Sequence, residues 1–253
     1  MRLFLVALQF LTRLPVRLDR FEPAWLNDCV RHFPLVGMLI GGVGAVVMWG
    51  AVQVWPAWVA ALLALAALVA LTGGFHEDGL ADTFDALGGV VSRDKALAIM
   101  KDSRIGSYGA LALVLSLMLR AVLLAVLAAR PMLGAVSALL ASHAFARAAA
   151  VGVMVSLPYG GDAEQAKAKP LALAVAPRNF SIALAWCALL LLVLAGLGVY
   201  LPRLLLAALA AVLVALLMRH WLLRRLGGYT GDGLGATEQL AEIAVLLAFT
   251  ASF

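Results

Sequence analysis

An acidic run at residues 76–85 contains the residue types most able to do chemistry. It holds Glu77, Asp78, Asp82 and Asp85 in a sequence that is 64% hydrophobic and only 13% charged. In a helix, Asp78, Asp82 and Asp85 fall at i, i+4 and i+7 and share one face. Like charges on one face repel unless a cation lies between them, and carboxylate oxygens suit Mg²⁺, Mn²⁺ or Ca²⁺. The spacing therefore predicts a metal site.

Glu77 points elsewhere on such a helix, so it is a candidate for a base or an outer metal-site group. The alternative for the whole run is a solvated cap that ends a membrane helix and meets lipid headgroups. No Lys or Arg is interleaved to neutralise the acids, which favours metal binding.

A second candidate segment, residues 100–109, precedes a long apolar run. Lys101, Ser103, Arg104 and Ser107 provide cations and hydroxyls beside two glycines at a helix start. Such a start suits a phosphate group. A basic membrane anchor followed by a helix cap is the alternative.

A third segment, residues 227–239, has five glycines in its first nine positions and contains Asp232. Glycine at this density marks backbone that turns sharply or lies against a ligand. Asp78-Gly79-Leu80 recurs here as Asp232-Gly233-Leu234, which predicts two helix entries that face one another. Asp232 is thus a catalytic candidate, and a plain turn or cap residue is the alternative.

Two arginines interrupt apolar runs. Arg147, one helical turn after His143, is expected to face a polar cavity or an anion, since intramembrane charge is costly. Arg120 is isolated in the sequence, so a structural partner or a snorkelling position explains it equally well. The glycine-rich run at 33–44 is expected to pack closely on another helix.

The composition places the chain among multi-pass membrane proteins, with a mean hydropathy of +1.02. We expect one integral membrane domain over residues 1–253, all-α, with six to seven transmembrane helices. The runs of about 20 apolar residues that predict the spans are 35–55, 57–75, 107–129, 132–157, 181–200 and 202–218, with a shorter one at 239–253. Residues 3–14 are expected to form a short interfacial or re-entrant helix, with a spanning helix as the alternative. The two cysteines do not support a disulfide framework.

Basic residues give the orientation. Most Lys and Arg fall in segments 1–34, 76–106, 158–180 and 219–237, the third of which includes Lys167 and Lys169, while the intervening turns are short. The positive-inside rule makes the charged side cytoplasmic. The net charge of +5 needs no nucleic-acid partner. Acids gathered on one side, with none expected in mid-span, favour a membrane enzyme over a cation transporter.

Together these segments resemble the cobalamin synthase family, the adenosylcobinamide-GDP ribazoletransferases. The matching stretches run in the family's order over nearly the whole chain: residues 10–15, 33–37, 74–85, 101–106 and 228–232. The acidic stretch is the specific one. CDP-alcohol phosphotransferases, membrane enzymes of lipid headgroups, are the runner-up family. Their Asp-rich signature is missing, because Thr83 rather than Arg follows Asp82 and the spacing differs.

The resemblance implies that α-ribazole, or its 5′-phosphate, attacks adenosylcobinamide-GDP through a ribose hydroxyl and that GMP leaves. It implies Mg²⁺ on the carboxylates, a carboxylate as base and cations around the phosphates. It also implies a bacterial inner membrane location, with a homo-oligomer left open. The candidate residues are, for catalysis, Glu77, Asp82 and Asp232; for metal, Glu77, Asp78, Asp82 and Asp85; and for substrate, Arg13, Lys101, Ser103, Arg104, Ser107 and Arg147.

Overall fold

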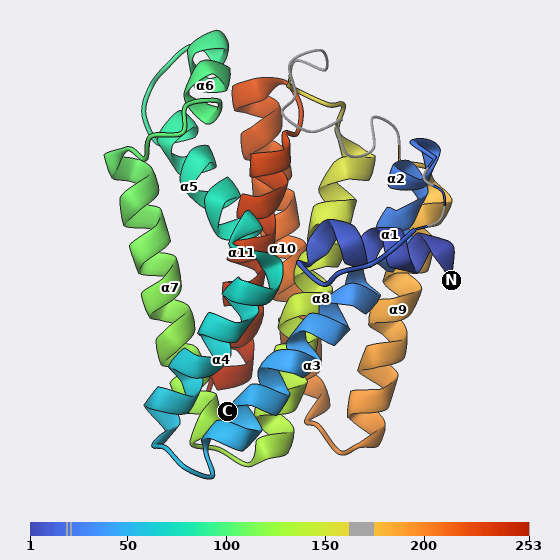
Figure 1. Cartoon of the computed structure of the whole chain (residues 1–253), viewed down its shortest axis with the longest axis vertical. Coiled ribbons are helices and arrows are strands. Elements are labelled where there is room, and N and C mark those ends of the chain that lie inside the picture. Colours follow the sequence, from blue (N-terminus) through green and yellow to red (C-terminus); the bar gives the residue numbers. More distant parts are fainter. Residues whose placement is uncertain (19, 21, 162–174, 253) are drawn as a thin grey trace.

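The chain forms an all-helical bundle in the computed structural model, which describes residues 1–18, 20, 22–161 and 175–252 (Figure 1). No strand occurs within these ranges. The elements in chain order are α1 (Arg2–Leu11), α2 (Ala24–Cys29), the short 3₁₀ helix η1 (Val30–His32), α3 (Phe33–Ala51), α4 (Ala57–Thr72), α5 (Phe75–Leu87), α6 (Arg93–Met100), α7 (Ser107–Ala128), α8 (Met132–Ser156), α9 (Pro177–Gly196), α10 (Leu201–Leu226) and α11 (Gly231–Thr250).

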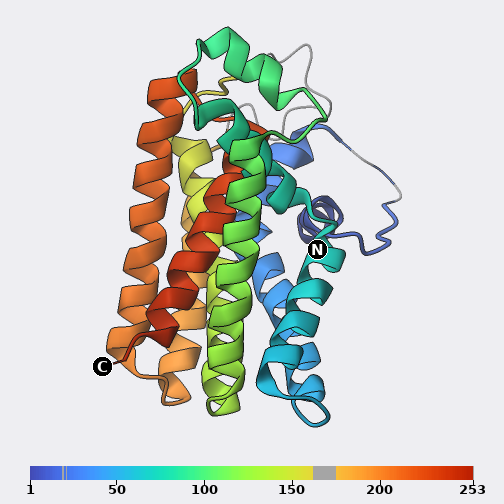
Figure 2. The same cartoon turned by 90° about the vertical axis from the view of Figure 1, so that its left-hand side faces the viewer.

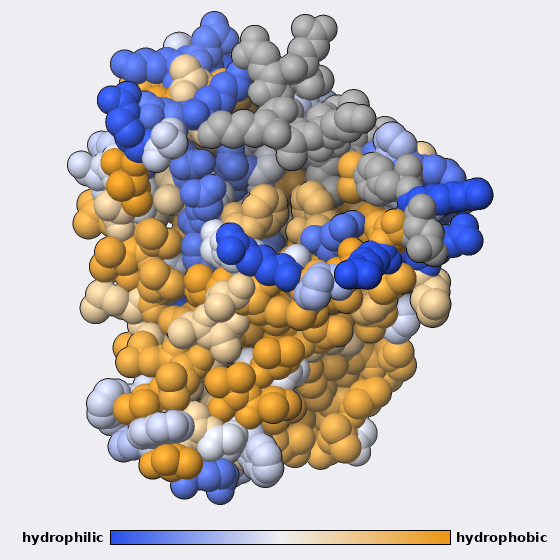
Figure 3. Space-filling model, in the orientation of Figure 1, coloured by the Kyte–Doolittle hydropathy of each residue, from blue (hydrophilic) through white to orange (hydrophobic). Residues whose placement is uncertain are grey.

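Several of these helices can cross a membrane. Among the described residues, five stretches are long and apolar enough: α2 to α3 taken together, α7, α8, α9 and α10. The pair α4 and α5 makes a sixth candidate, bent by 86° at its break. Apolar side chains form a band across the middle of the face seen in Figure 3, polar ones gather above it, and a smaller polar group lies at the lower edge. The predicted polytopic helical bundle is confirmed.

Helix α11 is the seventh long helix, and its place differs from that of a lipid-facing span. It contains Asp232, Glu238 and Glu242, and most of its side chains are buried among α5, α7, α8 and α10. The expected short apolar run at 239–253 is therefore the second half of a central helix that begins at Gly231.

The bundle has a polar end, which contains α6 and the starts of α7 and α11, and the short turns lie at the opposite end, as the charge pattern predicts. The turns that join α3 to α4, α7 to α8 and α9 to α10 lie at one end, with the C-terminus (Figures 1 and 2). Helix α6 and the starts of α7 and α11 lie at the other end. Lys167 and Lys169, which contributed to the charge pattern, lie outside the described residues.

Helix α1 lies across the long axis of the bundle (Figure 1). Its ten residues extend only about 15 Å, half the hydrocarbon thickness of a bilayer. It is too short to span, so the interfacial or re-entrant interpretation agrees with the structure.

The glycine-rich stretch of α3 packs on α8 as expected. A Cβ on Gly37 would lie 2.3 Å from the carbonyl oxygen of His143, and one on Gly41 would lie 2.3 Å from that of Leu139. Because these two glycines are four residues apart, they form one small-residue face that lets the two backbones touch.

Two arginines brace the polar end. Arg93 donates to the carbonyl oxygens of Leu226 and Gly160, both at 2.8 Å. Arg225 donates to the carbonyl oxygens at Leu87 and Gly89, also at 2.8 Å. These bonds fix the end of α5 and the start of α6 to the end of α10 and to Gly160, which follows α8.

Candidate active site

The acidic helix α5 begins at a sharp break. Gly73 and Gly74 both have positive φ, +73° and +72°, a conformation that side chains rarely adopt. They end α4 and send α5 off at 86°, so the acidic residues leave the direction of the span. The glycine pair is therefore the local sequence reason for the placement of the acids.

The predicted acidic face exists. Asp78 is exposed and Asp82 and Asp85 are half-buried, whereas His76 and Glu77 are buried on the other side of α5. This follows from the helical spacing of i, i+4 and i+7. Asp78 and Asp82 thus stand one turn apart on an accessible surface.

Asp85 has a structural role. Its carboxylate accepts backbone N–H groups of Gly106 at 2.7 Å and of Gly109 at 2.8 Å, which caps α7 from another helix. Gly106, the N-cap residue, has no side chain to do this. The helix start that was expected to receive a phosphate therefore receives the Asp85 carboxylate. That carboxylate is turned toward α7 rather than toward a shared metal with Asp78 and Asp82.

Asp232 lies beside the acidic helix, as the recurrence of Asp-Gly-Leu at residues 78–80 and 232–234 predicts. A Cβ on Gly79 would lie 3.0 Å from the backbone oxygen of Asp232 and 3.3 Å from the Cα atom of Gly235. Helices α5 and α11 therefore touch backbone to backbone where the two acidic segments meet. Of the glycines in the third segment, Gly235 is explained by this contact and Gly227 by a turn with φ +75°.

Cations lie near both ends of the acidic face. The side chain of Arg13 lies against Gly73, at the start of α5, and its backbone N–H donates to the carbonyl oxygen of Leu71 at 2.8 Å. The loop that contains Lys101 and Arg104 lies at the other end, because it leads into the helix start that Asp85 caps.

The other candidates in that loop are accessible. Lys101, Ser103, Arg104 and Ser107 are all exposed. Arg104 forms an ion pair with Asp102 at 2.6 Å, and hydrogen bonding to this carboxylate raises the pKa of the guanidinium. The pair is exposed, so Arg104 can exchange Asp102 for another anion at small cost.

A buried charge cluster lies behind the acidic face, and its centre is Arg120. The guanidinium contacts Glu77 at 2.7 Å and Glu242 and Gln239 at 2.8 Å each. Helices α5, α7 and α11 are joined by these contacts. Arg120 is therefore not isolated, and the structural-partner interpretation is the right one.

The second part of the buried charge cluster connects α8 to α11. Arg147 contacts Glu238 at 2.7 Å, His76 contacts the other oxygen of Glu238, and His143 lies 3.3 Å from Glu242. The anion expected near Arg147 is thus a carboxylate of the protein. Arg147 is buried and committed to this pair, so the structure does not bring it to the acidic face as a substrate-binding residue.

Two sequence expectations need correction here. Glu77 was predicted as a base and metal ligand, but it is buried and paired with Arg120, because adjacent residues of a helix point about 100° apart. Carboxylates were expected to be absent from mid-span, yet Glu242, the twelfth residue of α11, lies among helices that cross the bundle. Its pairing with Arg120 balances the charge locally.

The predicted metal ligands do not converge in the described part of the chain. No three His, Cys, Asp or Glu side chains there are arranged to hold a metal ion. The accessible pair Asp78 and Asp82 is suited to a cation that also takes oxygens from a substrate, since Mg²⁺ is commonly held by one or two carboxylates plus phosphates.

Comparison with known proteins gives a consistent result. The cobalamin-5-phosphate synthase family matches residues 3–250. An adenosylcobinamide-GDP ribazoletransferase from Leptothrix cholodnii is 52% identical over 99% of this chain and 95% of its own length. An enzyme of the same name from Shewanella amazonensis is 42% identical over 98% of this chain and 94% of its own length. One from Shewanella baltica is 44% identical over 95% of this chain and 90% of its own length. No solved structure matches. The resemblance drawn from the motifs is confirmed, and the chain belongs to the cobalamin-5-phosphate synthase family.

Proposed function

We propose that this protein is an adenosylcobinamide-GDP ribazoletransferase. It joins α-ribazole, or its 5′-phosphate, to adenosylcobinamide-GDP and releases GMP. The names of its relatives support this reaction, and one observation in the structure supports its location. Asp232 packs beside Gly79, so a third carboxylate-bearing residue stands next to the accessible acids Asp78 and Asp82.

The chemistry requires a hydroxyl oxygen to attack the phosphorus attached to cobinamide while the bond to the GMP oxygen breaks. Asp82 or Asp232 accepts the hydroxyl proton, since both belong to helices that meet at the accessible face. Arg13 and the loop residues Lys101 and Arg104 bind the phosphates, and their positive charges stabilise the departing GMP. Ser103 and Ser107 add hydroxyl donors at the same end.

We propose that Asp78 and Asp82 hold Mg²⁺ together with the pyrophosphate of the donor. The ion would neutralise part of the pyrophosphate charge, which otherwise repels the attacking oxygen. The buried charge cluster keeps α5 in place through Glu77, directly before Asp78. Glu77 is thus a positioning residue in this proposal.

The accessible face is proposed to be cytoplasmic in the inner membrane. Its support is the gathering of basic residues at the end of the bundle that contains α6. A phosphorylated, nucleotide-linked donor would then reach the acids from the cytoplasm.

The test is GMP release by the purified protein from adenosylcobinamide-GDP and α-ribazole, with the corrinoid product followed by chromatography. Asp78→Asn and Asp82→Asn should each lower kcat by about 10²-fold or more, as expected when one electrostatic group at a reacting centre is lost. Asp94→Asn, which changes an exposed carboxylate in α6, is the matched control and should leave kcat unchanged.

Two results would contradict the proposal. One is wild-type turnover in both Asp78→Asn and Asp82→Asn, which would remove the acidic face from the reaction. The other is CMP release from CDP-diacylglycerol with no GMP release from the corrinoid donor, which would assign the chain to lipid headgroup transfer.

A further inference from the structure

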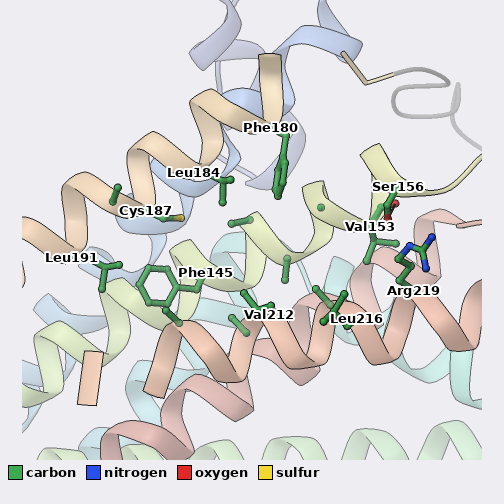
Figure 4. Close-up of a pocket in the computed structure, with 17 residues that line it drawn as sticks. Phe145, Val153, Ser156, Phe180, Leu184, Cys187, Leu191, Val212, Leu216 and Arg219 are labelled. Atoms are coloured by element: carbon green, nitrogen blue, oxygen red, sulfur yellow. Dashed lines mark hydrogen bonds between the residues drawn. The ribbon is translucent and has the colours of Figure 1, made fainter. Parts of the chain in front are cut away.

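A groove of about 470 Å³ opens between α8, α9 and α10, away from the acidic helix (Figure 4). Its walls are almost entirely apolar, and they include Phe145, Phe180, Leu184, Leu191, Val212 and Leu216. None of its lining residues comes from α5, α7 or α11. The groove is therefore separate from the candidate active site.

The groove runs along the membrane-spanning direction. Phe180 is the fourth residue of α9, near the polar end of the bundle, and Leu191 lies eleven residues further into that helix. Leu184, Val212 and Leu216 line the groove and are also about half exposed, so it opens sideways to the surroundings of the bundle. In a membrane those surroundings are acyl chains.

One cation stands at the polar end of this groove. Arg219 and Ser156 lie together at that end in Figure 4, far from Leu191. Arg219 is half-buried, and it forms no hydrogen bond or ion pair with any residue that the structure describes. A cation that is partly removed from water on a membrane-spanning helix is costly without an anion beside it.

We propose that this groove binds an anionic phospholipid from the bilayer. An acyl chain occupies the apolar walls from Phe180 to Leu191, and the lipid phosphate pairs with Arg219 at the polar end. The apolar walls alone would not distinguish one lipid from another, since all acyl chains are equally apolar. The selectivity for negative charge therefore comes from Arg219.

The test uses native mass spectrometry of the full chain released from bilayers of equal phosphatidylglycerol and phosphatidylcholine. The wild type should retain phosphatidylglycerol preferentially. Arg219→Gln should lower that preference about fivefold, which is the usual effect of one basic residue near an anionic surface. Arg219→Lys should keep it. Arg224→Gln is the matched control, because Arg224 is exposed on the same helix but does not line the groove.

A second variant tests the acyl-chain part. Gly152 lines the groove, and a Cβ there would meet only the ring of Phe180 at 3.4 Å, so Gly152→Leu should fill the space and lose both lipids. Gly134→Leu, on the same helix where a Cβ meets nothing within 4 Å, should behave as wild type. If Gly152→Leu does not fold, Ala188→Leu fills the groove from α9.

The proposal is overturned if Arg219→Gln retains the wild-type preference, or if groove-filling variants keep their lipid. It is also overturned if adenosylcobinamide-GDP displaces the retained lipid in proportion to its concentration, because the groove would then be a substrate site. Loss of lipid selectivity in Arg219→Gln with unchanged GMP release would separate this site from the proposed reaction.

Discussion

Replacing Arg120 by methionine should destabilise the bundle more than any single change at its surface. Arg120 is 1% exposed and contacts two carboxylates, those of Glu77 and Glu242. Within the described part of the chain Glu77 has no other partner, and its second oxygen accepts no hydrogen bond there. Methionine has a similar length but no charge, so it leaves Glu77 buried and unpaired.

The magnitude follows from burial. Breaking a buried ion pair by removing one partner typically costs about 3–5 kcal/mol, because the remaining charge has lost both water and its counter-charge. The exposed pair between Arg104 and Asp102 gives the comparison, since pairs in water contribute roughly 0–1 kcal/mol. We expect Arg120→Met to lower the free energy of unfolding by about 3 kcal/mol or more, and Arg104→Met by less than about 1 kcal/mol.

The assay is reversible unfolding in mixed micelles, followed by loss of helical circular dichroism. The double variant Arg120→Met with Glu77→Gln should recover part of the loss, because the orphaned charge is gone. A coupling of about 0.5–3 kcal/mol between the two positions is the expected size for residues in contact.

Equal destabilisation by Arg120→Met and Arg104→Met would refute this reasoning. So would a double variant that simply sums the two single losses, since the positions would then be uncoupled. Either result would mean that the cluster around Arg120 is solvated rather than buried.

The remaining predictions concern packing and orientation. Gly41→Ala should cost about 1–3 kcal/mol of stability, because its Cβ would lie 2.3 Å from the carbonyl oxygen of Leu139 and α3 and α8 must separate. Gly50→Ala is the control and should be neutral, since a Cβ there meets nothing within 4 Å. Equal thermal stability of the two variants would count against the contact between α3 and α8. For the membrane orientation, a single cysteine at Val54 should react with an impermeant maleimide in intact cells, and one at Val90 should not. Both positions are exposed, and both native cysteines are buried. Labelling at Val90 would reverse the topology.

Much of this architecture can be predicted from the sequence because membranes impose simple rules. Apolar length predicts the spans, and basic residues predict which ends lie together. The acidic face follows from helical spacing alone. Gly37 and Gly41 predict a close helix contact, since small residues four apart have few other uses in a span.

The buried charge cluster could not be predicted, since it depends on which helices are neighbours. Glu238 and Glu242 read as acids near the start of a span, and Arg120 reads as a lone cation in another one. Only the central position of α11 brings them together. The same is true of Asp85, which looks equivalent to Asp78 in spacing but meets the start of α7.

The repeated Asp-Gly-Leu sequence in α5 and α11 marks two segments that lie side by side in the structure. In α5 the glycine of the repeated sequence, Gly79, has no side chain that would keep α11 away. The residue of α11 that faces Gly79 is Gly235, two residues after the glycine of the repeated sequence there. This contact places Asp78, directly before Gly79, in the same region as Asp232 at the start of α11. Like charges gain nothing from such proximity by themselves. Their close approach is favourable when a cation lies between them, and the Mg²⁺ of the proposed reaction would supply that condition.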